Sequence, residues 1–298
     1  PRTRSTPSTK RRSPFEPEQD GVQRFAAKAL GWTLAGAPEA RFLPCLGSFV
    51  GSDILAGLLA TGLHEREELT ALIDLGTNGA IVVGTRDRML CASTAAGPAF
   101  EGARISMGMR AATGAISEVR LEEGRLQCRV LGQTPPRGIC GSGLVDAVAA
   151  GLDLGWVKPN GRLADRDVLE VSPPVVLKPG DIRELQLAKG AIAAGLRLLM
   201  QQWGASLEDL KRVYLAGAFG NYISRAGARR TGMLPFPPEK VTPTGNSALH
   251  GAKIALFNLP REEGAYQEIR AKTRHVPLND DPNFMDIFVD ELSFPERG

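Results

Sequence analysis

The sequence predicts an α/β fold, and three observations support this prediction. The chain has 298 residues, of which 43% are hydrophobic and 23% charged, as expected for a soluble globular protein with a full core. Its 34 glycines suit short turns and close packing of helices on a sheet. Short β-rich runs alternate with longer helical patterns along the chain. This length accommodates one large domain or two ordinary domains.

The first 16 residues are expected to form a disordered basic tail. Residues 1–14 contain five basic side chains and no acidic one, and they are rich in Ser, Thr and Pro. A nucleic-acid-binding arm is the alternative, but no aromatic side chain for base stacking precedes Phe15. The net charge of +3 is too small to predict a nucleic-acid or membrane partner. The chain begins with Pro1 and its tail lacks the apolar core of a signal peptide, so we expect a fragment or a processed cytoplasmic chain.

Disulfides and metal sites built from cysteine or histidine are not expected. The four cysteines lie far apart without iron–sulfur or zinc spacing, and the three histidines are equally scattered. Free thiols of a cytosolic protein are therefore favoured over disulfides. The cysteines are Cys45, Cys91, Cys128 and Cys140.

The first element expected after the tail is a short amphipathic helix over 21–31, where apolar residues recur at helical spacing. Residues 42–62 are almost uncharged, as in a membrane helix. Glycines and polar residues interrupt this stretch, however, and its continuous part is too short to cross about 30 Å of hydrocarbon. We therefore expect a strand or turn followed by a buried helix over 50–61.

The middle of the chain is expected to begin with a three-stranded meander at 70–74, 80–84 and 89–93. Pro98 fits the first turn of a helix within 95–110. The elements expected next, in order, are a hairpin of 119–121 with 126–130, a helix at 144–154, a helix capped by Asp181 at 182–203, a strand at 213–215, a strand at 241–242 and a helix at 247–257. The last 40 residues are expected to be peripheral.

This order of elements predicts the architecture. Three strands, a helix, a strand, a helix and a final strand–helix pair are the succession of a ribonuclease-H-like lobe. Two such lobes facing each other make the fold of actin, sugar kinases and acetate kinase, with ATP held between them. We expect residues 70–298 to be the second lobe, with an inserted α+β region at about 111–212. Residues 17–69 would then be the remnant of a largely missing first lobe, with an interlobe helix.

The stretch from Asp74 to Gly79, Asp-Leu-Gly-Thr-Asn-Gly, is the first candidate site. It lies between two apolar runs, so it is expected to form a tight glycine turn between strands. Backbone N–H groups in such a turn converge on an anion, and an acid beside them can hold Mg²⁺ or its water next to a phosphate. Taken alone, the motif is explained equally well by an ordinary hairpin.

A second glycine motif, Gly217 to Gly220, follows the strand expected at 213–215. Gly-x-x-Gly between a strand and a helix gives bare backbone against which a flat nucleoside can pack. Close strand–helix packing is the structural alternative. Because both motifs occur in this order and on these elements, ATP binding is the preferred interpretation. The sequence around Ser142 lacks the glycines of a dinucleotide-binding or serine-hydrolase motif, and no Walker-A motif is present.

Several long blocks of the sequence resemble one known family. In order, they are LPCLGSFVGSDILAGLLATGL, LIDLGTNGAIVVG, STAAGPAFEGARISMGMRAATGAI, PPRGICGSGLVDAV, DIRELQLAKGAI, VYLAGAFGNYI and GNSALHGAKIAL. From about Phe42 to Pro295 the chain is similar to the C-terminal domain of the ATP-dependent reductive activators of corrinoid proteins. That domain has the ASKHA fold, named after acetate and sugar kinases, heat-shock chaperones and actin. So many blocks in one order are far more specific than a single glycine motif.

The resemblance implies an enzyme, an ATP-dependent reductive activase, that reduces an inactive Co(II) corrinoid to methyl-accepting Co(I). The implied cofactors are ATP and Mg²⁺, with an electron supplied by an N-terminal [2Fe-2S] domain that is absent from this chain. The implied partner is a corrinoid protein or a corrinoid-dependent methyltransferase. ATP hydrolysis drives an unfavourable electron transfer only through a change of conformation, which suits a two-lobe clamp.

The resemblance also implies roles for residues of both motifs. Asp74 would orient Mg²⁺ or its water. The phosphate-binding residues would be Gly76, Thr77, Asn78 and Gly79, and the adenosine-binding residues would be Gly217, Ala218, Phe219 and Gly220. Glu101 is a candidate for the nucleotide cleft, or an acid that complements the dipole of a helix in its first turn. Asp53 is either an interlobe contact or a helix N-cap, and Cys140 is a small buried residue rather than a nucleophile.

The sequence departs from the family pattern because no ferredoxin motif and no first-lobe Asp-Ile-Gly-Thr loop are found. We therefore expect the chain alone to bind ATP poorly and to be inactive unless another polypeptide supplies the rest. The alternative is a non-enzymatic module that docks a corrinoid protein or forms a homodimer, with vestigial nucleotide loops. Which corrinoid protein is served does not follow from the sequence.

Overall fold

A mixed six-stranded sheet forms the centre of the protein, in the order β12-β11-β3-β4-β5-β13. The computed structural model describes residues 21–258 and 263–296, so the basic tail expected at 1–16 lies outside the described residues. The strands are β3 (Thr70–Leu75), β4 (Gly79–Gly84), β5 (Met89–Thr94), β11 (Arg212–Ala216), β12 (Val241–Gly245) and β13 (Thr273–His275). β3, β4 and β5 form the expected antiparallel meander, while β11 and β12 run parallel to β3.

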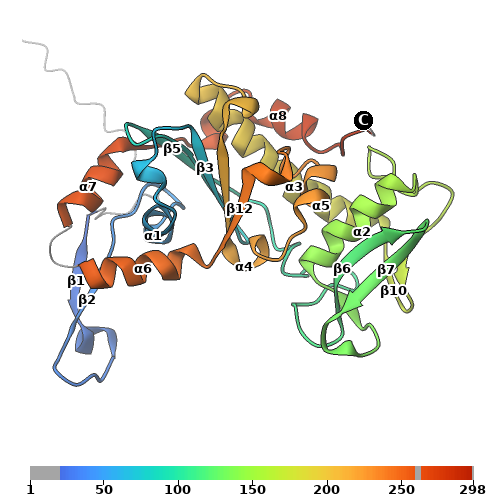
Figure 1. Ribbon diagram of the computed structural model, residues 1–298, viewed down its shortest axis with the longest axis horizontal. Coiled ribbons are helices and arrows are strands. Elements are labelled where there is room, and N and C mark those ends of the chain that lie inside the picture. Colours follow the sequence, from blue (N-terminus) through green and yellow to red (C-terminus); the bar gives the residue numbers. More distant parts are fainter. Residues whose placement is uncertain (1–20, 259–262, 297–298) are drawn as a thin grey trace, which may run out of the picture.

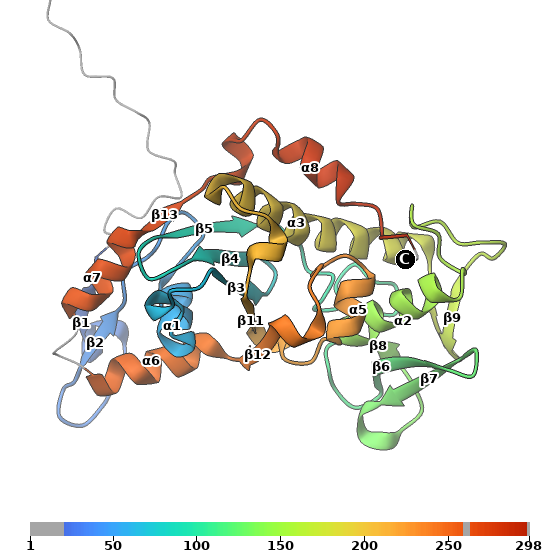
Figure 2. The ribbon, with the colours of Figure 1, turned by 45° about the horizontal axis from the view of Figure 1, so that its top comes forward.

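Helices cover both faces of this sheet (Figures 1 and 2). On one face, α1 (Ser52–Thr61) packs against α6 (Ser247–Asn258), with α7 (Glu263–Lys272) beside it. On the other face, α3 (Pro179–Trp203) contacts β4 and β5, and α8 (Phe284–Asp290) packs on α3. Successive strand residues point to opposite faces, so Leu72 belongs to the α1 core and Ile73 to the α3 core. The predicted ribonuclease-H-like lobe is confirmed by this arrangement.

A second, smaller unit lies beside the main sheet, at the end remote from β1 and β2 (Figure 1). It contains β6 (Ala115–Glu122), β7 (Arg125–Val130), β8 (Gly138–Ile139), α2 (Gly141–Asp153), β9 (Leu169–Ser172) and β10 (Val175–Leu177). The expected hairpin is β6–β7. The insertion expected at about 111–212 also includes α3, and α3 contacts strands of the main sheet. Two short helices, α4 (Gly217–Gly220) and α5 (Arg225–Arg230), lie between β11 and β12, and α5 packs against α2 of this unit.

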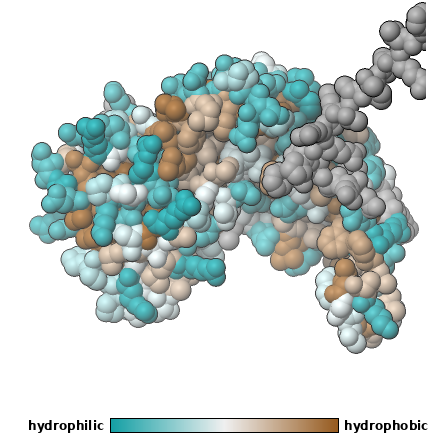
Figure 3. All heavy atoms as spheres, turned by 180° about the vertical axis from the view of Figure 1, so that it is seen from behind, coloured by the Kyte–Doolittle hydropathy of each residue, from teal (hydrophilic) through white to brown (hydrophobic). Residues whose placement is uncertain are grey.

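The prediction of an amphipathic helix at 21–31 is wrong. The chain forms β1 (Gln23–Ala26), which pairs antiparallel with β2 (Glu39–Phe42), and a single 3-10 turn follows β1. The apolar residues fit helical spacing, but Phe25 packs edge to face on Phe42 with ring centroids 5.7 Å apart. The β1–β2 ribbon protrudes from the body (Figure 3). The larger apolar side chains that it exposes are Phe25, Trp32, Leu34 and Phe42.

The helix expected to start near Pro98 is also absent. Residues 95–110 form turns, because their side chains are engaged in contacts far along the chain. The ring of Phe100 stacks on Phe219, and the backbone N–H and hydroxyl of Ser106 donate to Asp181 at 2.6 and 2.7 Å. Asp181 is the third residue of α3 and accepts from the N–H of Lys178, so α3 begins at Pro179, earlier than expected.

The last 40 residues are expected to be peripheral, but the described part of this segment, 263–296, belongs to the fold. β13 adds to the sheet parallel to β5, and Phe294 is buried. Short 3-10 helices complete the structure at Ala27–Leu30, Leu63–Glu65, Leu131–Gln133, Leu207–Asp209, Pro238–Lys240 and Leu278–Asp280. None of the helices in the described ranges has the length and apolarity needed to cross a membrane.

Candidate nucleotide site

The two glycine motifs lie side by side at one edge of the sheet. β11 is parallel to β3, and Ala216 pairs with Asp74 in register. Parallel strands end at the same edge of a sheet, so the bend after β3 and the bend after β11 emerge together. The side chain of Asp74 is half-buried, while Thr77 and Asn78 are exposed at the tip of the bend. The arrangement on which a shared ligand site depends is therefore present.

Gly217 is the point of closest approach between the bends. Its φ is +88°, and a Cβ atom there would overlap the carbonyl oxygen of Leu75 and lie 2.8 Å from Asp74 Oδ1. Only glycine adopts this conformation without strain and leaves room for both neighbours. The second motif thus needs its glycine for packing against the first. This contact places the backbone of 217–220 beside the candidate phosphate-binding bend.

Asp74 has an unusual environment for a carboxylate. Burial, with a smaller contribution from the negative charge of Asp53, raises the pKa of Asp74 to about 6. Asp53 lies in the first turn of α1, where it is exposed, and Gly51 is the N-cap of that helix. The N-cap alternative for Asp53 is therefore wrong. Asp53 and Asp74 together make this edge of the sheet negative.

Glu101 contacts the bend directly. The hydroxyl of Thr77 donates a hydrogen bond to Glu101 Oε1 at 2.7 Å, and the N–H of Gly97 donates to the carbonyl oxygen of Thr77 at 3.0 Å. Because no helix forms at 95–110, the helix-dipole explanation of Glu101 is wrong. The second oxygen, Glu101 Oε2, is buried without a hydrogen-bond partner among the described residues.

Phe219 is engaged within the protein rather than free to hold a ligand. Its ring stacks on Phe100 with centroids 4.3 Å apart and an interplanar angle of 14°. Gly220 is buried against Leu215. Of the proposed nucleoside shelf, Gly217 itself is partly exposed.

A large cavity begins where this shelf ends, and the sequence analysis did not predict it. Its volume is about 880 Å³, and it lies between the smaller unit and the residues after α4. Its polar lining includes Glu118, Arg120, Ser142, Asp146, Asn221 and Ser224. Asn221 directly follows the second glycine motif, so the cavity continues from it along the chain.

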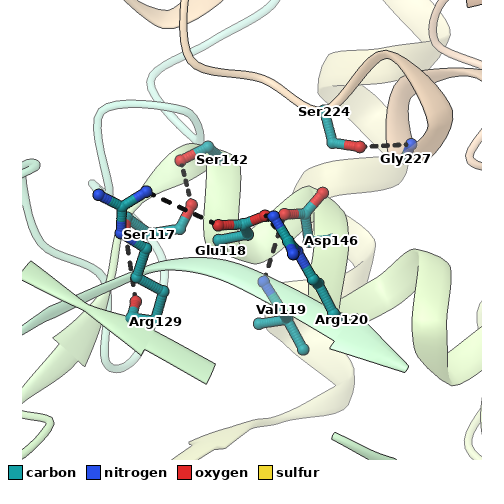
Figure 4. Close-up of polar contacts among 9 residues, drawn as sticks. All are labelled: Ser117, Glu118, Val119, Arg120, Arg129, Ser142, Asp146, Ser224 and Gly227. Carbon is teal, nitrogen blue, oxygen red and sulfur yellow. Dashed lines mark hydrogen bonds and ion pairs between the residues drawn. The ribbon is translucent and has the colours of Figure 1, made fainter. Parts of the chain in front are cut away.

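Asp146 is the buried acid of this cavity (Figure 4). It accepts a hydrogen bond from the N–H of Val119 at 3.3 Å. Burial is the main cause that raises the pKa of Asp146 to about 7, and the negative charge of Glu118 contributes. Ser224 caps α5 by accepting from the N–H of Gly227 at 3.1 Å. The sequence signal for Asp146 is an acid between the apolar residues Val145 and Ala147 in the interior of helix α2.

The carboxylate at the glycine bend fits Mg²⁺ among the metals that proteins commonly bind. Among the residues that the structure describes, no group of three or more His, Cys, Asp or Glu side chains is placed to hold an ion. The cysteines are free thiols, and Cys140 is buried. Mg²⁺ is commonly held by one or two carboxylates together with water and substrate phosphates. Asp74 beside an accessible glycine bend matches that pattern.

Comparison with known proteins identifies the family. Residues 68–298 match the family described as the C-terminal domain of RACo, the ASKHA domain, and residues 4–66 match the RACo middle region. The chain belongs to the RACo family. This confirms the resemblance and the ASKHA fold expected from the sequence blocks.

Individual relatives of this RACo family chain agree with that assignment. It is 38% identical over 284 residues to the corrinoid activation enzyme RamQ of Eubacterium limosum, covering 86% of the chain and 47% of the relative. It is 29% identical over 283 residues to a Co(II) methylated amine-specific corrinoid protein reductase of Methanosarcina barkeri, covering 86% and 51%. A solved reductive activator for corrinoid, iron-sulfur protein superposes with a TM-score of 0.84 at 35% identity, covering 96% of this chain and 49% of that one. The chain thus spans about half the length of these relatives.

Proposed function

We propose that this chain is the ATP-binding and ATP-hydrolysing part of a reductive activase that restores a Co(II) corrinoid to Co(I). Membership of the RACo family supports a role in corrinoid activation. The observation that carries the nucleotide part is the contact between the two glycine bends, with Asp74 at their junction. The electron would come from a [2Fe-2S] centre outside this chain. The partner would be a corrinoid protein or a corrinoid-dependent methyltransferase in the cytoplasm.

Each part of the site has a proposed task. Backbone N–H groups of 76–79 and the Thr77 hydroxyl would bind phosphate oxygens. The carboxylate of Asp74 would hold a water of Mg²⁺, and the bound ion would neutralise phosphate charge. The backbone from Gly217 and the adjoining cavity at Asn221 would receive the nucleoside. ATP bound between the main lobe and the smaller unit would favour one relative position of these two parts. Hydrolysis of ATP would remove this preference and allow the two parts to change their relative position.

ATP titration with and without Mg²⁺ tests this function. We expect the wild-type chain to bind ATP in a Mg²⁺-dependent way. Its dissociation constant should be above the micromolar range, because a two-lobe clamp binds ATP with contacts from both lobes and this chain would supply those of the second lobe. Asp74→Asn should weaken Mg²⁺-ATP binding by about tenfold or more, since a neutral amide does not attract the ion's water. Asp167→Asn, the same change at an exposed loop position, should bind like wild type.

One observation favours the docking or dimerisation module as a second candidate. Exposed aromatic and aliphatic side chains occur on the β1–β2 ribbon and at the end of α6, where Leu256 and Phe257 are exposed. Such side chains are common in protein interfaces. If ATP binds neither wild type nor Asp74→Asn at millimolar concentration, vestigial nucleotide loops become the better explanation.

A further inference from the structure

Thr77 lies at the exposed tip of the bend after β3, and a carboxylate holds its hydroxyl. The hydroxyl donates a hydrogen bond to Glu101 Oε1 at 2.7 Å. A threonine hydroxyl has one proton and two lone pairs. Because the proton is directed at Glu101, the lone pairs remain for a ligand in the bend. The contact of Thr77 with phosphate proposed above therefore brings a lone pair, rather than the proton, toward the phosphate.

Glu101 is suited to accept the proton of Thr77. Its second oxygen, Oε2, is buried and has no hydrogen-bond partner within the described residues, so Oε1 is the oxygen that exchanges a proton with the hydroxyl. A buried acceptor without a partner is costly, and the cost is larger for a charged group. A proton taken from Thr77 neutralises the carboxylate and lowers this cost. A hydroxyl and a carboxylate within about 2.6–3.2 Å have the geometry of a nucleophile and its general base.

Contacts on both sides hold this pair of side chains together. The N–H of Gly97 donates to the carbonyl oxygen of Thr77 at 3.0 Å. The ring of Phe100, the residue before Glu101, stacks on Phe219 with centroids 4.3 Å apart. The bend and the loop that carries the base are therefore fixed to each other and to the second glycine motif. The base lies on its nucleophile without any movement of the loop.

We propose that Thr77 is a phosphoryl acceptor and that the chain transfers the terminal phosphate of bound ATP to its hydroxyl, an inference that rests on the nucleotide function proposed above. The Thr77 oxygen forms a bond to the γ-phosphorus. The bond between this phosphorus and the oxygen that bridges it to the β-phosphate breaks, and ADP leaves with that oxygen. The Thr77 proton passes to Glu101 Oε1. The products are ADP and a phosphorylated Thr77, so ATP is the only other reactant.

Phosphorylation of Thr77 inhibits the nucleotide site. A phosphothreonine carries a charge of about −2 at neutral pH, and this phosphate occupies the bend that otherwise binds the phosphates of the nucleotide. Its charge repels those of a second ATP molecule. The modified chain therefore binds ATP more weakly than the unmodified chain. The reaction is a self-modification that occurs once at this position and regulates the site in which it takes place.

Incubation of the full chain with millimolar Mg²⁺-ATP, followed by mass spectrometry of its peptides, tests this inference. Wild type should gain one phosphate at position 77, and Thr77→Ser should gain it at the same position, whereas Thr77→Val should not. Glu101→Gln keeps the shape of the side chain but removes the base, so it should slow the modification by about a hundredfold or more. Phosphorylated wild type should bind ATP at least about tenfold more weakly than unmodified wild type.

Matched controls separate this inference from the proposed function. Thr113→Val and Glu170→Gln make the same changes at exposed positions and should be modified at position 77 at the wild-type rate. Thermal unfolding followed by circular dichroism should show that all variants are folded, and ATP titration measures binding to each. If wild type binds ATP but position 77 stays unmodified, or if folded Glu101→Gln is modified as fast as wild type, the inference is overturned while nucleotide binding stands. If ATP does not bind to wild type, the proposed function fails and the inference fails with it.

Discussion

At the end of β3, the carboxyl group of Asp74 lies among segments that come from distant parts of the chain. Gly217 brings the second bend against it, and the charge of Asp53 reaches it from α1. Both effects keep the carboxyl group from ionising as readily as in water, which is why its pKa is raised to about 6. A group of this kind favours a cation beside it, since the cation restores the ionised form. The same property has a measurable cost in stability.

The pH dependence of unfolding should reveal that cost. The folded state holds the Asp74 proton up to about pH 6, whereas the unfolded chain releases it near 3.8. Stability from this group is therefore fully present below pH 3.8 and is lost as pH rises through 6. At neutral pH, Asp74→Asn should raise the free energy of unfolding by about 2 kcal/mol. Urea unfolding of wild type and Asp74→Asn from about pH 4 to pH 7 measures this difference. If the free energy of unfolding changes with pH by the same amount in both proteins, the prediction is contradicted.

At residue scale, the sequence predicted which types of side chain line the site but not their contacts. Asp74 and the glycines were identified from their motifs. Two features escaped, because they depend on residues far apart in sequence: the stacking of Phe219 on Phe100 and the hydrogen bond between Thr77 and Glu101. Asp146 escaped for a similar reason, since its burial depends on β6 and α5 closing over α2.

Among the elements, the pair α1 and α6 shows the closest dependence on small residues. Gly251 of α6 faces the backbone of α1 so tightly that a Cβ atom would overlap the carbonyl oxygen of Ala56. In the reverse direction, Gly57 of α1 packs against Ser247 of α6. Glycine at these positions lets the helix axes approach, and the pair then covers one face of the sheet.

Gly251→Ala is expected to destabilise the protein by about 2 kcal/mol or more, because neither backbone can move without separating the helices. Gly264→Ala is the matched control. It makes the same change in α7, where nothing lies within 4 Å of the added atom, and should leave stability unchanged or raise it by about 0.5 kcal/mol. Thermal unfolding of both variants measures the difference. If Gly251→Ala and Gly264→Ala unfold at the same temperature, the helices α1 and α6 can move apart at little cost and the prediction is contradicted.

Element types were predicted well where a regular apolar pattern extends over many residues, as in α1, α2 and α3, or where apolar runs are separated by clear turns, as in the meander. The failures have a common cause. At 21–31 a helical spacing of apolar residues was outweighed by strand pairing with β2, and at 95–110 a local helix was outweighed by contacts to Phe219, Thr77 and Asp181. Short segments have little intrinsic helix stability, so tertiary contacts decide their conformation.

At the scale of the whole molecule, the C-terminal segment ties the two units together. The side chain of Gln186 donates to the carbonyl oxygen of Leu292 at 2.9 Å, and Lys189 Nζ donates to that of Ser293 at 2.5 Å. The N–H of Phe294 donates to Pro159 at 2.8 Å. Lys189 is 1% exposed, and burial lowers its pKa to about 8. A buried cation of α3 therefore anchors the end of the described chain.

The anchor predicts a second pH effect, opposite in sign to that of Asp74. The unfolded chain holds the Lys189 proton up to about pH 10.5, whereas the folded protein releases it near 8. Stability should therefore rise with pH between these values. In Lys189→Met that rise should be absent, while Lys253→Met, at an exposed position of α6, should behave as wild type. Urea unfolding from about pH 7 to pH 10 measures it. A rise that persists in the Met variant would contradict the assignment.

By itself, the sequence determined the meander β3–β5, the long helices α1, α2 and α3, the two glycine motifs and the family, because these depend on local patterns and on long blocks of residues. The tertiary structure decided which groups meet. It set the register that brings Ala216 beside Asp74, the burial that shifts the pKa of Asp74, and the contact of Glu101 with Thr77. Each of these depends on desolvation and packing between segments far apart in the chain, and such long-range effects leave no periodic trace in a single sequence.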